Sequence, residues 1–109
     1  MSMYYIIDIR RDLGRPYITL WRPDNAGYCW PLCWAGLYSK ETIEEAHGYY
    51  FEREGRKFVR FPVRADLVAR IAVAPTPGRI DGDAGPVIPN TNKIRRYLVR
   101  NRLRNEVAG

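Results

Sequence analysis

The alternation of apolar and polar positions predicts an antiparallel β-sheet in the first third of the chain. Met3 to Arg10 is rich in β-branched and aromatic residues on two alternating faces, which is typical of a strand. Tyr17 to Trp21 alternates in the same way. The turn-forming run from Arg22 to Gly27 then reverses the chain, so a third strand is expected from Tyr28 to Leu37. Pro31 interrupts this third strand, which places it at an edge or a bulge of the sheet.

Three helices are expected after this region. Ser39 is a typical N-cap residue, and the apolar positions after it repeat at helical spacing until Gly48. One face of this first helix would carry Ile43, Ala46, His47 and Tyr50. A second short helix is predicted for residues 63–73, and Asn90 or Thr91 should cap the third. One face of the third helix would carry Ile94, Tyr97, Leu98 and Asn101.

A short strand and a long loop complete the predicted fold. Phe58 to Pro62 alternates as a strand and follows a polar turn from Arg53 to Lys57. Residues 75–89 are rich in proline and glycine, which predicts a loop of unusual length for a small domain. We expect an α+β fold: an antiparallel sheet of three to four strands, two packed helices and a basic C-terminal helix. Residues 1–91 would form a single domain that includes this loop, and residues 92–109 a basic helix or tail.

The composition limits the classes of protein to which the chain can belong. Its 109 residues suffice for one modest core, and 46% hydrophobic with 28% charged residues argues against disorder. No apolar run approaches the roughly 20 residues of a membrane span, and the N-terminal stretch lacks the pattern of a secretory signal. Two cysteines do not make a disulfide framework. We therefore expect a cytoplasmic protein that does not insert into membranes.

The positive charge is concentrated at the C-terminal end. The chain carries a formal net charge of +6, and residues 92–109 hold six basic residues against one acid. Fifteen of the 18 cations are arginine, which suits phosphate or carboxylate recognition, although a GC-rich genome that favours arginine codons gives the same bias. The predicted contacts to nucleic acid or another partner are Lys93, Arg95, Arg96, Arg100, Arg102 and Arg104. We expect the far end of the last helix to leave the body of the protein. The alternatives to nucleic-acid binding are a solvated helix end or tail and an anionic protein partner.

An aromatic surface is the second candidate binding site. Tyrosine and tryptophan platforms flanked by arginine stack the bases of single strands, and the same side chains anchor protein interfaces. Packing in the domain core is the alternative explanation for so many large rings. The predicted contact surface comprises Trp21, Arg22, Tyr28, Trp30 and Trp34.

Metal and catalytic motifs are weak in this sequence. Cys29 and Cys33 have the wrong spacing for a zinc knuckle, and His47 is the sole candidate third ligand. On one strand the two cysteines would face the same side, which suits core packing, although a cysteine nucleophile with His47 as its base is conceivable. The run Asp81 to Gly85 fails the calcium-loop pattern, because Gly85 stands at a ligand position. The sequence therefore predicts no metal, no cofactor and no catalysis.

One stretch resembles a group of small phage and prophage proteins for which no activity is known. The group shares a WxP…GY…AGxY-S/T pattern before an acidic helix. Here the pattern is matched by Trp21 to Pro23, then Gly27-Tyr28, then Ala35 to Ser39. Some members also carry a PNT segment similar to Pro89 to Thr91. The resemblance covers about half of the chain and implies a mobile-element origin in a bacterial host; it assigns no functional residue. The chain departs from the group after Tyr28, where the group has polar residues.

Two functions of different classes follow from these features. The first is a small phage-type accessory protein that binds nucleic acid or a ribonucleoprotein through its C-terminal arginines, without catalysis. The second is an inhibitor or adaptor that docks on a host protein, such as a component of a defence system, through its aromatic hairpin. The first depends on the arginines from Arg95 to Arg104, and the second on Tyr28 to Trp34.

Overall fold

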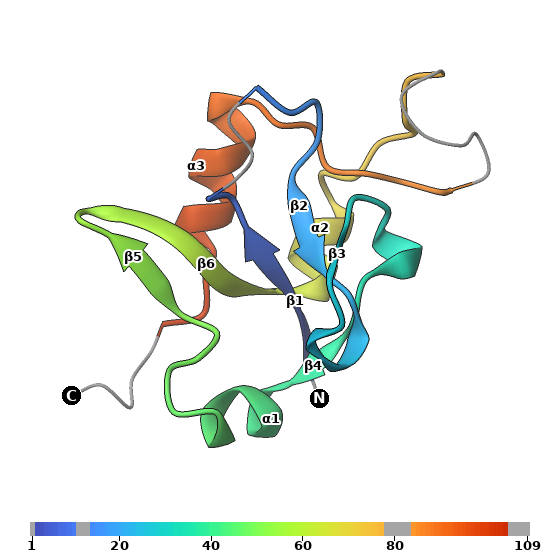
Figure 1. Cartoon of the computed structure of the whole chain (residues 1–109). Helices are drawn as coiled ribbons and strands as arrows, with labels where there is room; N and C mark the ends of the chain where they lie inside the picture. Colours follow the sequence, from blue (N-terminus) through green and yellow to red (C-terminus); the bar gives the residue numbers. More distant parts are fainter. Residues whose placement is uncertain (1, 11–13, 78–83, 105–109) are drawn as a thin grey trace.

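The computed structural model describes residues 2–10, 14–77 and 84–104 of the 109 residues. Strands and short helices alternate along this part of the chain (Figure 1). Two of the helices are single 3₁₀ turns, labelled η1 and η2. In chain order the elements are β1 (Met3–Asp8), β2 (Thr19–Trp21), η1 (Pro23–Asn25), β3 (Tyr28–Cys29), η2 (Leu32–Trp34), β4 (Tyr38–Ser39), α1 (Lys40–Glu45), β5 (Glu52–Glu54), β6 (Lys57–Arg64), α2 (Ala65–Ala69) and α3 (Asn92–Arg100).

The described strands form one antiparallel sheet of six strands, in the order β3-β2-β1-β6-β5, and β4 pairs with β1 outside this path. The predicted α+β class and the antiparallel pairing are confirmed, but the predicted three to four strands were an undercount. β4 has only two residues, and β5 lies at the start of the segment expected to be a polar turn. Neither strand is long or apolar enough to give a period-two pattern, so neither could be recognised from the sequence.

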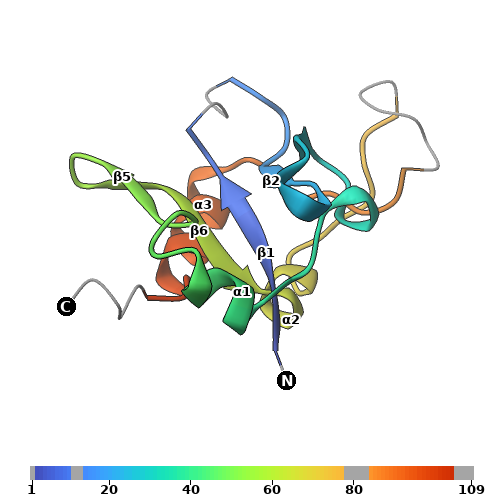
Figure 2. The same ribbon diagram turned by 60° about the horizontal axis from the view of Figure 1, so that its bottom comes forward.

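β1 is the central strand, and its alternating side chains enter two different cores. Ile7 belongs to a cluster with Val68 of α2 and Leu98 of α3. Ile6 belongs to a second cluster with Ile43 of α1. Neighbouring residues of a strand point to opposite faces, so α2 and α3 cover one face of the sheet and α1 covers part of the other (Figure 2).

β6 is the second long strand and extends beyond the predicted Phe58 to Pro62. Five of its residues pair with β1, and Ile6 stands opposite Pro62. The Pro62 carbonyl accepts a hydrogen bond from the Leu103 N–H at 2.8 Å, and Arg102 forms an antiparallel bridge with Val63. The chain after α3 therefore adds to the edge of the sheet beside β6. The expectation that the far end of the last helix leaves the body is wrong up to Leu103.

The third strand is shorter than predicted. β3 ends at Cys29, and Pro31 is the N-cap of η2 rather than a residue of a bulged strand. The segment then returns through Gly36, whose N–H donates to the Trp21 carbonyl at 2.9 Å. Two tyrosines on this side hold the preceding turn, because the hydroxyl groups of Tyr38 and Tyr50 both hydrogen-bond Asn25 Oδ1, at 3.2 and 2.9 Å.

The helices begin where the capping residues predict but end early. Ser39 Oγ accepts a hydrogen bond from Thr42 N–H, and Thr91 Oγ1 accepts one from Ile94 N–H, both at 3.1 Å. α1 ends at Glu45, so His47 does not share its buried face; His47 is exposed and has a φ of 52°. α2 covers only Ala65–Ala69 of the predicted 63–73, because β6 continues to Arg64.

We expect the substitution Gly36→Ala to destabilise the fold by about 1–3 kcal/mol, as overpacking against rigid backbone does. A Cβ at this position would lie 2.7 Å from Pro23 Cα and 2.8 Å from Pro23 N. The backbone of the Arg22–Gly27 turn would have to move, and the tyrosine hydrogen bonds to Asn25 would move with it. Urea denaturation monitored by tryptophan fluorescence gives the free energy of unfolding. A variant as stable as the parent would show that this close approach is not required.

Candidate functional site

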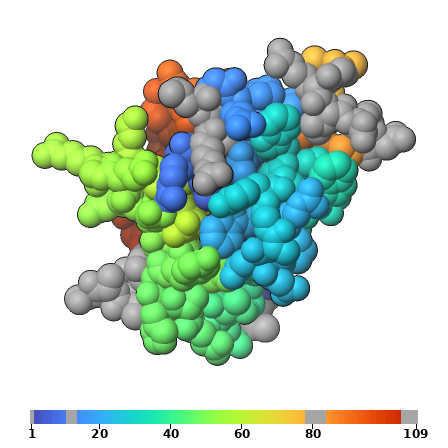
Figure 3. All heavy atoms as spheres, in the orientation of Figure 1, coloured from blue at the N-terminus to red at the C-terminus, as the bar shows by residue number. Residues whose placement is uncertain are grey.

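A groove of about 710 Å³ lies between α3, the β5–β6 turn and the end of β1. The β5–β6 turn projects from the body in the space-filling view and forms one wall of this groove (Figure 3). α3 forms the opposite wall. We call this the basic groove, and its lining residues are Ile9, Arg10, Glu54, Arg56, Lys57, Phe58, Val59, Arg95, Arg96, Val99 and Arg100.

The lining of the basic groove combines an apolar floor with a strong positive charge. Six of the eleven residues are basic and only Glu54 is acidic. That acid is already engaged, because Arg10 forms ion pairs with Glu54 at 3.7 Å and with Glu52. Glu52 also pairs with Arg60 at 2.9 Å. The two acids beside the groove are therefore paired with Arg10 and Arg60. They do not form ion pairs with the other basic residues that line the groove.

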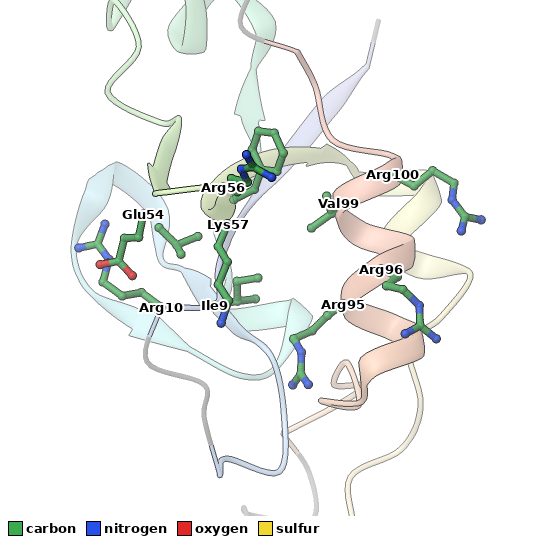
Figure 4. Close-up of a pocket in the computed structure, with 11 residues that line it drawn as sticks. Ile9, Arg10, Glu54, Arg56, Lys57, Arg95, Arg96, Val99 and Arg100 are labelled. Atoms are coloured by element: carbon green, nitrogen blue, oxygen red, sulfur yellow. The ribbon is translucent and has the colours of Figure 1, made fainter.

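The cations occupy different levels of the groove (Figure 4). Lys57 lies between the β5–β6 turn and α3, and the Arg95 side chain extends from α3 on the side that faces Lys57. The guanidinium groups of Arg96 and Arg100 extend from α3 away from the turn, so these residues form the outer rim. Among the described acids, none forms an ion pair with Arg56, Lys57, Arg96 or Arg100.

Arg95 has a different role within this group. Its guanidinium group donates to the side-chain oxygens of Asn90 and Asn92, at the start of α3. Thr91 caps the same turn through Ile94. Arg95 is therefore held in place by neutral acceptors, and none of the described acids forms an ion pair with it.

A second arginine cluster surrounds Phe58. The guanidinium carbon of Arg102 lies 3.7 Å from the centre of the Phe58 ring, and that of Arg53 lies 5.4 Å from it. Arg102 also donates to the Val99 carbonyl at 2.7 Å. Its pKa is lowered by burial and by the positive charges of Arg104 and Arg53. Like charges gathered on one aromatic ring are stabilised by an anion, so this cluster extends the positive surface beyond the groove.

The structure divides the six predicted basic residues into two groups. Arg95, Arg96 and Arg100 line the groove, and Lys93 lies on the exposed side of α3 one turn before Arg96. Arg102 and Arg104 follow the helix. Sequence reasoning missed Arg10, which follows β1, and also Arg56 and Lys57, which lie in the β5–β6 turn and at the start of β6. The position of Arg56 and Lys57 opposite α3 depends on the pairing of β5 with β6, and this polar segment has no local pattern that predicts such a pairing.

The predicted aromatic surface is only partly accessible. Trp21 is 5% exposed, with its ring stacked edge-on against Tyr28, Tyr49 and Tyr50. Trp30 is half-buried against Tyr17. Tyr28 and Trp34 remain exposed, at 47% and 41%. Arg22 joins these two, because its Nε donates to the Tyr28 carbonyl at 2.9 Å and its guanidinium carbon lies 5.5 Å from the centre of the Trp34 ring.

The two cysteines do not lie together on one strand face. Cys29, the last residue of β3, is buried in the core. Cys33 is exposed on η2, and its thiol donates to the Ala84 carbonyl at 2.7 Å. Within the described part of the chain, no group of three or more His, Cys, Asp or Glu residues could hold a metal ion. Residues 81–83 of the weak calcium-loop pattern lie outside the described residues.

We expect only Cys33 to react with iodoacetamide in the native protein near pH 8. The thiolate is the reactive form, and burial raises the pKa of Cys29 to about 11, which leaves about one molecule in a thousand ionised at that pH. Mass spectrometry after brief alkylation should locate a single adduct, and a second should appear after denaturation in guanidinium chloride. Equal labelling of both cysteines in the native state would contradict this placement of Cys29.

Comparison with protein-family models, with curated proteins and with solved structures finds no significant match to this chain. The resemblance to phage proteins therefore stays a prediction. None of the helices in residues 2–10, 14–77 and 84–104 is long and apolar enough to cross a membrane.

Proposed function

We propose that this protein binds single-stranded nucleic acid, free or within a ribonucleoprotein, through the basic groove and the outer face of α3, and that it does so without catalysis. The observation that carries this proposal is the convergence of cations from three distant parts of the sequence on one hollow, with its only lining acid already paired. We further propose that the protein is a phage-type accessory protein acting in the cytoplasm of a bacterial host.

The arrangement of charges fits a phosphodiester chain better than a single small anion. Lys93, Arg96 and Arg100 follow one another at positions i, i+3 and i+7, so they form a stripe along the exposed side of α3. Arg95 of the same helix and Lys57 of β6 both face the groove. Cations spread over two sides of a helix can contact successive phosphates, and each contact releases counterions, which supplies affinity.

The floor of the groove favours a single strand over a duplex. Ile9 and Val99 are half-buried and line the hollow beside Phe58, whose ring carries two arginines. Apolar and guanidinium surfaces of this kind can contact the faces of unpaired bases, which a duplex keeps stacked inside. α3 is also short, and the residues that follow it, Arg102 and Leu103, pair with β6 at the edge of the sheet. The body of the domain would therefore hinder deep entry of this helix into a major groove.

A second candidate function is docking on a host protein through the exposed rings. The observation that favours it is the pair Tyr28 and Trp34, joined by Arg22 and adjacent to the exposed Leu37, at 52% exposure. Large apolar side chains with arginine are typical of interface anchors. This surface is smaller than predicted because Trp21 is in the core.

Fluorescence anisotropy with labelled oligonucleotides tests the proposal. The chain should bind a mixed-sequence single-stranded RNA or DNA at low salt, and should bind a duplex of the same total charge more weakly. The affinity should fall steeply as salt is added. A pull-down from bacterial lysate with and without nuclease separates the two candidates, since partners captured through nucleic acid should disappear after nuclease. Failure to bind any oligonucleotide at low salt would reject the first function in favour of the second.

A further inference from the structure

A second, smaller hollow of about 280 Å³ lies over the face of the sheet that is opposite to α3, outside the basic groove. Asp8 and Thr19 stand opposite each other on β1 and β2, so their side chains share this face. Trp21 is two residues after Thr19 on β2, so its side chain lies on the same face. The residues that line the hollow are Asp8, Arg15, Thr19, Tyr28, Cys29 and Trp30.

Asp8 is the unusual residue of this hollow. It is 5% exposed and is the one buried charged residue among those described. Its Oδ2 accepts a hydrogen bond from Trp21 Nε1 at 3.1 Å, and its Oδ1 accepts one from the Arg10 N–H at 3.2 Å. No described cation forms an ion pair with it. Arg60 stands opposite Asp8 on β6, but its guanidinium carbon lies over the Trp21 ring, 5.1 Å from the ring centre, and makes no ion pair with the carboxylate. A buried carboxylate at the wall of a hollow, with two hydrogen bonds and no ion pair to a described cation, can accept further donors from a ligand.

The two hydrogen bonds also fix the orientation of the carboxylate. Each oxygen of an ionised carboxylate can accept two hydrogen bonds, and the described part of the chain supplies one to each oxygen of Asp8, which leaves one acceptor position on each for a ligand. A fixed carboxylate with two parallel free positions matches a ligand edge that carries two neighbouring donors. Guanine has such an edge, with N1–H beside the N2 amino group. In adenine, cytosine and uracil every donor on the pairing edge lies next to an acceptor, which a carboxylate would repel.

The remaining walls suit a nucleotide. Tyr28 and Trp30 supply aromatic surface against which a base can stack, and the half-buried Trp30 ring is held edge-on by Tyr17. Arg15 is exposed at the same hollow, where its guanidinium group can reach a phosphate. The Asp8 carboxylate therefore suits the edge of a base, the aromatic rings suit its face, and the Arg15 guanidinium group suits the phosphate of the same nucleotide.

The position of the hollow links it to the basic groove. Asp8 lines the hollow, whereas Ile9 and Arg10, the next two residues of the chain, line the groove on the other side of the sheet. Asp8 and Arg10 are two residues apart in the chain, so their backbones lie within about 7 Å of each other. One strand passing over the end of β1 can therefore contact both sites.

We propose that this hollow binds one unpaired guanine base of the strand held in the basic groove, with the Asp8 carboxylate accepting hydrogen bonds from guanine N1–H and the N2 amino group. The inference rests on the proposed function, because it assigns a sequence preference to the same nucleic acid. The other ligand with two parallel donors is a guanidinium group, but Arg15 at the hollow and the net charge of +6 disfavour a cation.

The test compares octamers, a length within the range that small single-strand-binding domains cover. Octauridine is measured against octamers in which one central uridine is replaced by guanosine, adenosine or inosine. We expect the guanosine octamer to bind about tenfold more tightly than octauridine, and adenosine to give no gain. Inosine lacks the N2 amino group, so it should recover only part of the gain. Free guanosine monophosphate should compete weakly, because it lacks the contacts of the groove.

The variant Asp8→Asn tests the same contact from the side of the protein. Asparagine can still accept from Trp21 but presents a donor in place of one acceptor. The guanosine preference should fall to about twofold or less, while the affinity for octauridine stays the same. If this variant does not fold, the inosine comparison still decides, since it leaves the protein unchanged.

Several outcomes would overturn the inference. Equal affinity for all four octamers would reject the guanine site while the proposed function stands. A guanosine preference that survives Asp8→Asn, or that is matched by inosine, would show that the carboxylate does not read this edge. Competition by L-arginine as strong as that by guanosine monophosphate would identify a guanidinium site instead. Failure of every octamer to bind would remove both the inference and the function on which it rests.

Discussion

Replacing Lys57, Arg96 and Arg100 together by glutamine is expected to weaken the binding of single-stranded nucleic acid at least about tenfold near 0.1 M salt. All three are exposed, line the basic groove and form no ion pair with a described acid. Glutamine keeps the helix propensity and most of the side-chain length, so the fold should be retained. The slope of log affinity against log salt should become shallower by about two, since each lost contact to a single strand contributes roughly 0.7.

A matched control separates the position of the charge from its amount. Lys40, Arg64 and Arg70 are also one lysine and two arginines, are exposed and do not line the groove. Arg64 differs from the other two because it forms an ion pair with the exposed Asp66 at 2.5 Å. Their replacement by glutamine lowers the formal net charge by the same three units. This control variant should keep nearly the affinity and the salt slope of the parent. If both variants lose the same affinity, binding depends on overall charge, and the basic groove is not an interface.

The variant Leu98→Ala is expected to lower the free energy of unfolding by about 3 kcal/mol, as large-to-small changes in a core do. Leu98 is fully buried and packs in one cluster with Ile7 of β1 and Val63 of β6. A small domain has only about 5–15 kcal/mol to lose, so the melting temperature should fall by about 10 °C or more. Scanning calorimetry or thermal circular dichroism measures this shift.

Arg96→Ala is the control for this prediction, because it changes the same helix on its exposed side. Its stability should lie within about 0.5 kcal/mol of that of the parent, while its affinity for nucleic acid falls. A Leu98→Ala variant that melts with the parent would mean that α3 is a detachable tail and not part of the core.

The fold class could be predicted from the sequence because β1 and the capping residues carry strong local patterns. Ile6 and Ile7 mark a strand that is buried on both faces, and Ser39 and Thr91 cap the helices as expected. The lengths could not be predicted in the same way. β6 continues through Pro62, a residue that usually ends a strand, because the proline carbonyl is still paired by the Leu103 N–H at the sheet edge. This contact joins residues 41 positions apart and leaves no local pattern.

The candidate site could be predicted only for the part that lies on one helix. The arginines of α3 are visible in the sequence as a charge cluster, whereas Lys57 belongs to a stretch that the sequence predicts only as a polar turn. Tertiary pairing of β5 with β6 brings that turn opposite α3. Asp8 gave no signal at all, since an acid at the end of a strand is ordinary. Asp8 becomes a candidate only because it is buried and hydrogen-bonded to Trp21, and this contact depends on the register of β1 against β2.

The most direct test of the basic groove is a nuclear magnetic resonance titration of the ¹⁵N-labelled protein with a single-stranded octamer at low salt. The proposed function predicts that the largest amide shift changes occur in α3, in the β5–β6 turn from Glu54 to Lys57, and at Ile9 and Arg10. The exposed segment from Tyr28 to Leu37 should change less, except where it borders the guanine hollow. Shift changes confined to Trp34 and Leu37, or none at saturating octamer, would contradict the basic groove as the nucleic-acid interface.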